Sequence, residues 1–99
     1  VEAAIKATRE ADKPIGALCI SPALMAKVLG AVEVTIGSDA DTAGAIEAMG
    51  GKHTNTTHGE IVVDASHKLV TTPCYMLDAS VSQIAAGADA VVNKLIELA

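Results

Sequence analysis

Blocks of apolar and polar residues predict helices and strands in alternation over the first half of the chain. A mixed helix over residues 2–12 precedes a uniformly apolar strand over 15–19. An apolar helix over 22–29, a short strand over 32–36 and a helix over 38–49 follow. This order predicts parallel strands joined by right-handed crossovers.

The second half predicts a hairpin and a long helix. Residues 52–59 are polar and suit a loop or an edge strand, whereas 60–63 and 68–72 flank a turn as in an antiparallel hairpin. A last helix is expected over 79–98. Its apolar positions recur in one stripe, formed by Ile84, Ala88, Val91, Leu95 and Leu98. We expect this stripe to pack on the sheet.

The composition favours a sheet that is covered on both faces and completed by other polypeptide. The 99 residues are 51% hydrophobic but contain one Tyr and no Phe or Trp. Ala, Val, Ile and Leu suit a parallel sheet between helices. Two parallel strands, 15–19 and 32–36, are too few to bury the apolar faces of the predicted helices. The chain also begins at Val1 inside a predicted helix. We therefore expect that part of the fold lies upstream.

The net charge and the cysteines limit the classes of binding partner and the cellular compartment that we expect for the protein. The net charge is −5, and the seven Lys and Arg residues are scattered, which argues against nucleic acid as a partner. No apolar run is long enough to span a membrane. Cys19 and Cys74 form neither a CxxC pair nor a disulfide framework, which fits a reducing compartment. A cytoplasmic protein is predicted, or an organellar one if a targeting segment lies upstream.

Cys19 is the strongest candidate for chemistry because it lies where a strand turns into a helix. Ser21 suits the N-cap and Pro22 the first helical position, so the helix begins two or three residues after the sulfur. The positive end of the helix dipole favours thiolate over thiol, and the free N–H groups of the first turn can hold an oxyanion. The alternative is a buried structural cysteine.

Four stretches extend this pattern to a known family. Residues 13–25 resemble the nucleophile-elbow segment of the ThiJ/PfpI superfamily, which has the class I glutamine amidotransferase-like fold. Residues 35–43, 47–53 and 70–77 resemble the ElbB-type glyoxalase subfamily. The resemblance implies a flavodoxin-like three-layer α/β sandwich with a mostly parallel sheet. Residues 1–99 would be its C-terminal half with an added β-hairpin, in a protein that forms a homodimer.

The resemblance also implies roles for individual residues. Cys19 corresponds to the nucleophile, and the backbone N–H of Ile20 to one oxyanion donor. The partner glutamate and the glycine-rich loop of the family have no position in this chain. Many relatives have a histidine where this chain has Gly37, as the ElbB type does, and this shifts acid–base work onto the missing glutamate.

The activity implied is that of a glyoxalase-like lyase without cofactor, metal or glutathione. Such an enzyme converts a small dicarbonyl such as glyoxal into a 2-hydroxy acid through a cysteine adduct. Two other functions remain open: a redox-sensing or interaction protein whose cysteine is oxidised, or an amidotransferase-like hydrolase. The hydrolase would use His58-Gly59-Glu60, which matches the His-x-Glu of class I amidotransferases.

Other polar residues have simpler expected roles. The spacing of the three histidines and the cysteines matches no common zinc pattern. We expect His53 to be a hydrogen-bonded structural residue and His67 to lie in the hairpin turn. Cys74 is expected near the active-site end of the sheet, where it either lines the pocket or fills space, and the second role is favoured. Asp39 and Asp41 suit helix capping.

Overall fold

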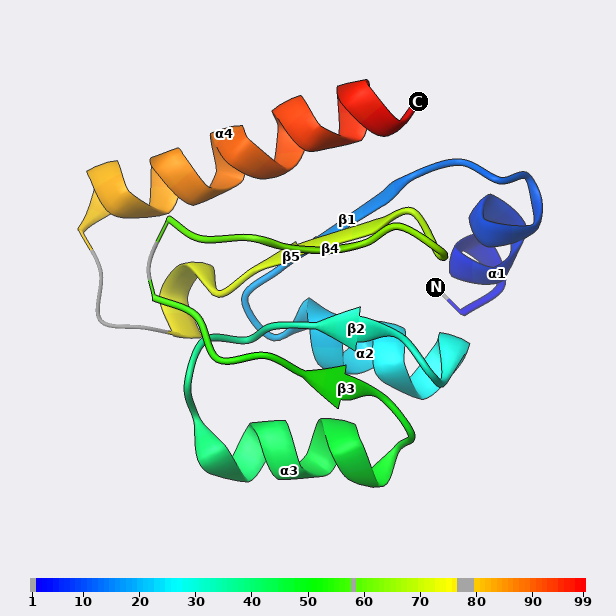
Figure 1. Ribbon diagram of the computed structural model, residues 1–99, viewed down its shortest axis with the longest axis horizontal. Helices are drawn as coiled ribbons and strands as arrows, with labels where there is room; N and C mark the ends of the chain where they lie inside the picture. Colours follow the sequence, from blue (N-terminus) through cyan, green and yellow to red (C-terminus); the bar gives the residue numbers. More distant parts are fainter. Residues whose placement is uncertain (1, 58, 77–79) are drawn as a thin grey trace.

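The computed structural model describes residues 2–57, 59–76 and 80–99 and contains the helices and strands that the sequence predicts (Figure 1). In chain order the elements are α1 (Glu2–Glu10), β1 (Ile15–Leu18), α2 (Ser21–Leu29), β2 (Glu33–Val34), α3 (Ala40–Ala48), β3 (Lys52–His53), β4 (Val62–Asp64), β5 (Leu69–Thr72), the 3₁₀ turn η1 (Cys74–Met76) and α4 (Val81–Leu98). The expected hairpin is confirmed, since β4 and β5 are antiparallel. Part of the polar stretch 52–59 is the edge strand β3.

The pairing of the strands differs from the simple crossover scheme. The main sheet has the order β1-β5-β4, and β2 pairs in parallel with β3 in a separate two-stranded ladder. The predicted hairpin joins the parallel strands through β5, which pairs with both β1 and β4. All four residues of β5 are buried, and this strand takes the central place with β1 parallel on one side. The parallel ladder pairs Ile15 with Leu69 at one end and Leu18 with Thr72 at the other.

Helices cover both faces of the main sheet (Figure 1). α4 lies against β1 and β5, and it comes so close that a Cβ on Gly16 would lie 2.9 Å from side-chain atoms of Val91 and Leu95. The absence of a side chain at Gly16 thus allows helix and sheet to touch. On the other face Ala17 packs in one core cluster with Met25 and Ala26 of α2. The alternation of residues along β1 therefore produces three layers.

The helix ends confirm one predicted cap and correct another. Asp39 caps α3 and accepts a hydrogen bond from the N–H of Thr42 at 3.1 Å. Hydrogen bonds from the side chain and the N–H of Thr42 lower the pKa of Asp39. Ser21, expected as the N-cap of the second helix, is instead its first residue, and Ile20 is the N-cap without a side-chain hydrogen bond. Pro22 lies in the first turn, as expected.

Within the described ranges, none of the helices combines the length and the apolar character needed to cross a bilayer.

Candidate functional site

Cys19 occupies a sharp turn between β1 and α2. Its backbone has a φ of 63°, in the left-handed region that costs a residue with a Cβ about 1–2 kcal/mol. Its N–H donates to the carbonyl oxygen of Thr72 at 3.1 Å, which continues the β1–β5 ladder by one bond and holds the turn in place. The thiol is half-buried and free. Strained backbone at a strand-to-helix turn is the local geometry of a nucleophile elbow.

The start of α2 lies directly beside this cysteine. Ile20 has helical backbone angles, and its carbonyl accepts the N–H of Ala23 at 3.0 Å. The first N–H groups of a helix have no partner within it, so the backbone that follows Cys19 can donate to an oxyanion. Ile20 is 52% exposed, so the turn that carries Cys19 lies at the surface of the described chain. The roles of Cys19 and Ile20 stay predictions.

Cys74 lies at the same end of the sheet as Cys19. β1 and β5 are parallel with Leu18 opposite Thr72, so the residues that follow both strands meet at one edge. This confirms the expected position of Cys74. Its side chain is half-buried, its φ is 51°, and the residue lines a small pocket with five others. These are Gly59, Thr72, Gln83, Ile84 and Gly87.

Gly37 follows β2 and has a backbone that only glycine adopts readily. Its φ is 103°, its N–H donates to Thr35 Oγ1 at 3.0 Å, and its carbonyl accepts the N–H of Thr56 at 3.0 Å. A histidine in this conformation would be strained. The backbone thus gives a physical reason for glycine at this position.

His53 is a hydrogen-bonded structural residue, as expected. Its Nε2 accepts the backbone N–H of Ile36 at 3.2 Å, which links β3 to the chain that leaves β2. Burial lowers the pKa of His53, and the charge of Glu47 opposes this shift without reversing it. A neutral ring is needed at this position, because a protonated Nε2 cannot accept a hydrogen bond.

This geometry predicts a pH dependence of stability. Because the pKa of His53 is lower in the folded than in the unfolded state, its contribution is present above about pH 6.5 and is lost as the pH falls through the folded value. We expect His53→Gln, which offers an acceptor that does not titrate, to remove this part of the pH dependence. Urea denaturation from pH 5 to pH 8 measures it. Identical pH profiles for both proteins would contradict the assignment.

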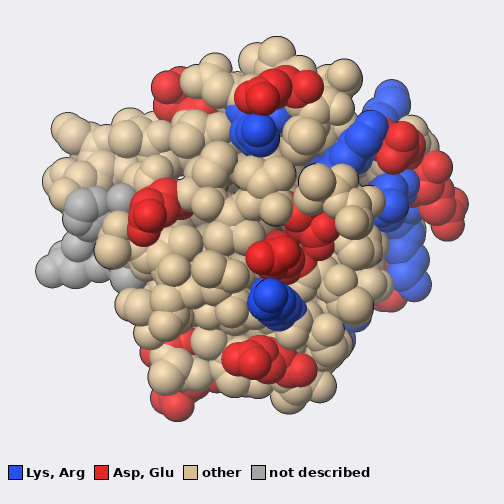
Figure 2. All heavy atoms as spheres, in the orientation of Figure 1, with Lys and Arg blue, Asp and Glu red and all other residues tan. Residues whose placement is uncertain are grey.

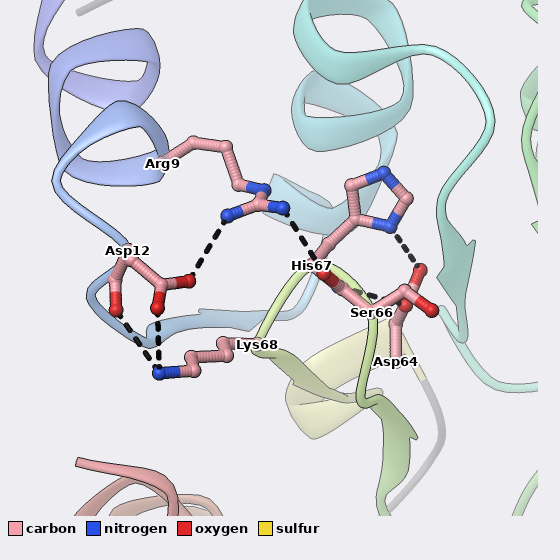
Figure 3. A network of polar contacts seen from close by, with 6 residues as sticks. All are labelled: Arg9, Asp12, Asp64, Ser66, His67 and Lys68. Atoms are coloured by element: carbon pink, nitrogen blue, oxygen red, sulfur yellow. Dashed lines mark hydrogen bonds and ion pairs between the residues drawn. The ribbon is translucent and has the colours of Figure 1, made fainter.

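Asp64 and His67 form a pair that the sequence did not reveal (Figure 3). His67 Nδ1 lies 2.9 Å from Asp64 Oδ2. The same carboxylate accepts the N–H of Glu33 at 2.8 Å and the N–H of His67 at 3.1 Å. Burial raises the pKa of Asp64, but the hydrogen bonds from Glu33 and His67 outweigh it and lower the pKa overall. The pair lies at the Ile15–Leu69 end of the sheet, opposite Cys19.

A cationic and acidic network ties the turn of this hairpin to α1 (Figure 3). Arg9 donates to the carbonyl of Ser66 at 3.0 Å and lies 3.4 Å from Asp12. Lys68 Nζ donates to the carboxylate and to the backbone carbonyl of Asp12, both at 3.2 Å. These partners account for Arg9 and Lys68 as structural residues.

The described residues hold no metal site, and the face shown in Figure 2 has no purely basic patch. Within 2–57, 59–76 and 80–99, no group of three or more His, Cys, Asp or Glu is placed to hold a metal ion. Lys and Arg are intermixed with Asp and Glu on the face that Figure 2 shows. The hydrolase hypothesis rests on His58, which lies outside the described residues. Glu60 of the same motif accepts hydrogen bonds from the N–H and Oγ1 of Thr57 at 2.7 and 2.8 Å.

A three-layer α/β fold with a strained cysteine between strand and helix is the arrangement of class I glutamine amidotransferase-like proteins, and comparison with known proteins supports this superfamily. The chain is 43% identical over 107 aligned positions to the human glutamine amidotransferase-like class 1 domain-containing protein 3, mitochondrial, and 41% identical to the rat ES1 protein homolog, mitochondrial. Each alignment covers 99% of this chain and 40% of the relative. The chain thus spans less than half the length of these relatives. No family model matches it.

A solved structure confirms the fold class. An isoprenoid biosynthesis protein with an amidotransferase-like domain from Ehrlichia chaffeensis superimposes with a TM-score of 0.91 at 31% identity. The match covers 98% of this chain and 46% of that chain. The chain therefore has the flavodoxin-like α/β fold that the sequence predicts.

Proposed function

We propose that this chain carries the nucleophile of a glyoxalase-like enzyme that needs no cofactor, of the ElbB type. One observation carries the proposal: Cys19 is held in a left-handed conformation between β1 and α2, by a hydrogen bond from its own N–H to Thr72. A conformation that costs free energy persists where the surrounding structure enforces it, and such sites are often functional. The half-exposed thiol beside a helix N-terminus is suited to attack a carbonyl carbon.

The reaction proceeds through a covalent adduct on Cys19. The thiolate forms a C–S bond to one aldehyde carbon of glyoxal, and the N–H of Ile20 stabilises the resulting oxyanion. A base removes the proton from that carbon, and the enediolate is protonated on the neighbouring carbon, which leaves a thioester. Water then breaks the C–S bond and releases the 2-hydroxy acid. One carbon is oxidised and the other reduced, so no external oxidant is needed.

The base is expected outside these 99 residues. Gly37 has no side chain to offer, His53 already accepts a hydrogen bond, and the Asp64–His67 pair lies at the opposite end of the sheet. These observations favour a carboxylate from elsewhere in the protein, as the family resemblance implies. We therefore propose that residues 1–99 are the C-terminal half of one domain.

The exposed edge of β1 supports this domain proposal. Within the described part of the chain β1 is an edge strand, with β5 on one side only. The N–H groups of Ile15 and Cys19 point to β5, so those of Gly16 and Leu18 point to the outer edge. An uncovered edge next to exposed apolar side chains is a liability that proteins normally cover. The apolar side chains near these elements are Ile20, Leu24, Val92 and Ile96.

We expect the amide hydrogens of Gly16 and Leu18 to exchange slowly in the full-length protein, because a further strand pairs with them. Residue-resolved hydrogen exchange measures this, with Cys19, which bonds to β5, as the internal reference. In the isolated 99-residue chain, the protection of Gly16 and Leu18 should fall further than that of Cys19. Rapid exchange of both residues in the full-length protein would show that β1 is a true edge strand.

The names of the relatives bear on the compartment of this protein. The names of the human and rat relatives place those proteins in mitochondria, which supports the organellar alternative for this protein over the cytoplasmic one. A homodimer is proposed from the family resemblance alone.

Steady-state turnover of glyoxal without glutathione tests the activity. The expected result is release of a 2-hydroxy acid by the full-length protein. Hydrolysis of glutamine without dicarbonyl turnover would favour the amidotransferase-like alternative, and absence of both activities would favour a redox or interaction role.

A further inference from the structure

The two cysteines of the chain follow neighbouring strands and end at one edge of the sheet. Cys19 comes directly after β1, and its N–H bonds to Thr72, which lies two residues before Cys74. Paired strands are about 4.8 Å apart, so the backbones that carry the two thiols are close neighbours although they are distant in sequence. The parallel ladder between β1 and β5 is what creates this proximity.

Both cysteines also have unusual backbone conformations. Among the described non-glycine residues, positive φ occurs at Cys19, at Cys74 and at two residues far from this edge, Asp12 and Lys68. Two cysteines at one edge of the sheet that both have this strained backbone are hard to explain by space filling, because a glycine or an asparagine adopts the conformation at lower cost. At this edge of the sheet, the described non-glycine residues with positive φ are the two cysteines.

We propose that Cys19 and Cys74 are an oxidisable dithiol, in which Cys74 is the resolving thiol for Cys19. Both are free, and both are half-exposed, so a small oxidant such as a peroxide has access to them. Cys74 opens η1, a single 3₁₀ turn, and short turns of this kind adjust with few broken contacts. A disulfide requires Cα atoms roughly 4.4–6.8 Å apart, and we expect this adjustment to bring the two residues within that range.

The chemistry is balanced with peroxide as the oxidant. The Cys19 thiolate attacks one peroxide oxygen, the O–O bond breaks, and the products are a sulfenic acid on Cys19 and water. The Cys74 thiolate then attacks the Cys19 sulfur, an S–S bond forms, and a second water leaves. Two electrons pass from the two thiols to the peroxide, and a thiol reductant reverses the process. A transient bond of this kind is compatible with a reducing compartment.

Disulfide formation removes the nucleophile and so protects it from irreversible oxidation. Without a resolving thiol, a sulfenic acid is oxidised further to sulfinic acid, which thiols do not reduce. The effect on turnover rests on the proposed function, whereas formation of the disulfide does not depend on it.

Peptide mapping of the peroxide-treated full-length protein tests the proposal. We expect mass spectrometry of the unreduced digest to show a peptide that links Cys19 to Cys74, and dithiothreitol to abolish it. In Cys74→Ala, dimedone should instead label Cys19 as a sulfenic acid. Circular dichroism of the reduced variant checks that it is folded, and Cys19→Ala, in which no link to Cys74 is expected, is the matched control.

Two results would overturn the proposal. One is equal accumulation of sulfinic acid on Cys19 in the wild type and in Cys74→Ala at the same peroxide dose. The other is a linkage of Cys19 to a different cysteine. Glyoxal turnover before and after treatment is a separate readout, so that loss of the proposed enzyme activity is not confused with loss of the disulfide.

Discussion

Cys19→Ala is expected to abolish glyoxal turnover, with kcat reduced by at least about 10³-fold, because removal of a covalent nucleophile leaves only binding and oxyanion contributions. Alanine keeps the Cβ, so the strain of the left-handed backbone is unchanged and the fold is preserved. Steady-state assays of the full-length protein, with release of the 2-hydroxy acid as readout, measure the effect.

Cys74→Ala is the matched control for this prediction. It removes a half-exposed thiol with positive φ at the same edge of the sheet, and turnover of the reduced enzyme should stay within a few-fold of the wild type. Equal losses in both variants would indicate damage to the edge rather than removal of a nucleophile. Cys19 should also react faster than Cys74 with iodoacetamide at neutral pH, because it lies at a helix N-terminus.

Replacement of the histidines distinguishes a carboxylate base outside this chain from the His-x-Glu scheme. If the base is a carboxylate outside this chain, replacing each histidine by Asn leaves turnover within about tenfold, since loss of a general base costs 10²- to 10⁴-fold. His53 and His67 are both engaged in hydrogen bonds of the fold. A loss of the larger size in His58→Asn alone would favour the His-x-Glu scheme and amidotransferase-like chemistry.

Local features of this fold could be predicted from the sequence, whereas its long-range pairing could not. The strand predicted over 15–19 and observed over Ile15–Leu18, the N-cap of α3 and the hairpin follow from periodicity and turn residues close in sequence. The pairing of β1 with β5 joins residues more than fifty positions apart, and no local pattern specifies it. β5 is central because it pairs with both β1 and β4, and all four of its residues are buried. The sequence does not indicate this, since Thr71 and Thr72 lack the apolar character of a buried strand.

The candidate site likewise combines features that the sequence predicts with features that it does not. The position of Cys19 could be predicted because strand, cysteine and helix start are consecutive, but its positive φ is set by the hydrogen bond to Thr72. The sequence does not indicate the role of Asp64, because an acidic residue beside a predicted turn normally suggests exposure. Asp64 accepts hydrogen bonds from three donors, two on His67 and one on Glu33. Glu33 is thirty-one positions away in the sequence, so no local pattern indicates this contact.

Asp64→Asn is expected to destabilise the protein by about 2–3 kcal/mol, because the amide presents two donors to a site that holds donors already. Asp64 is 7% exposed and accepts from both Glu33 and His67, so little water can replace the lost partners. Urea unfolding of the full-length protein measures the change. Asp12→Asn is the matched control: this side chain is 69% exposed, its ion pairs lie at the surface, and a change within about 1 kcal/mol is expected (Figure 3).

The pH dependence of the Asp64 contribution gives the same test a second readout. Because its pKa is lower in the folded state, the unfolded chain binds more protons as the pH falls, and stability declines as the pH drops below about 4. Wild type and Asp64→Asn should therefore converge in stability towards low pH, while Asp12→Asn runs nearly parallel to the wild type. If Asp64→Asn is as stable as Asp12→Asn at pH 7, the carboxylate does not anchor the hairpin to β2, and the Asp64–His67 pair is free to serve another role.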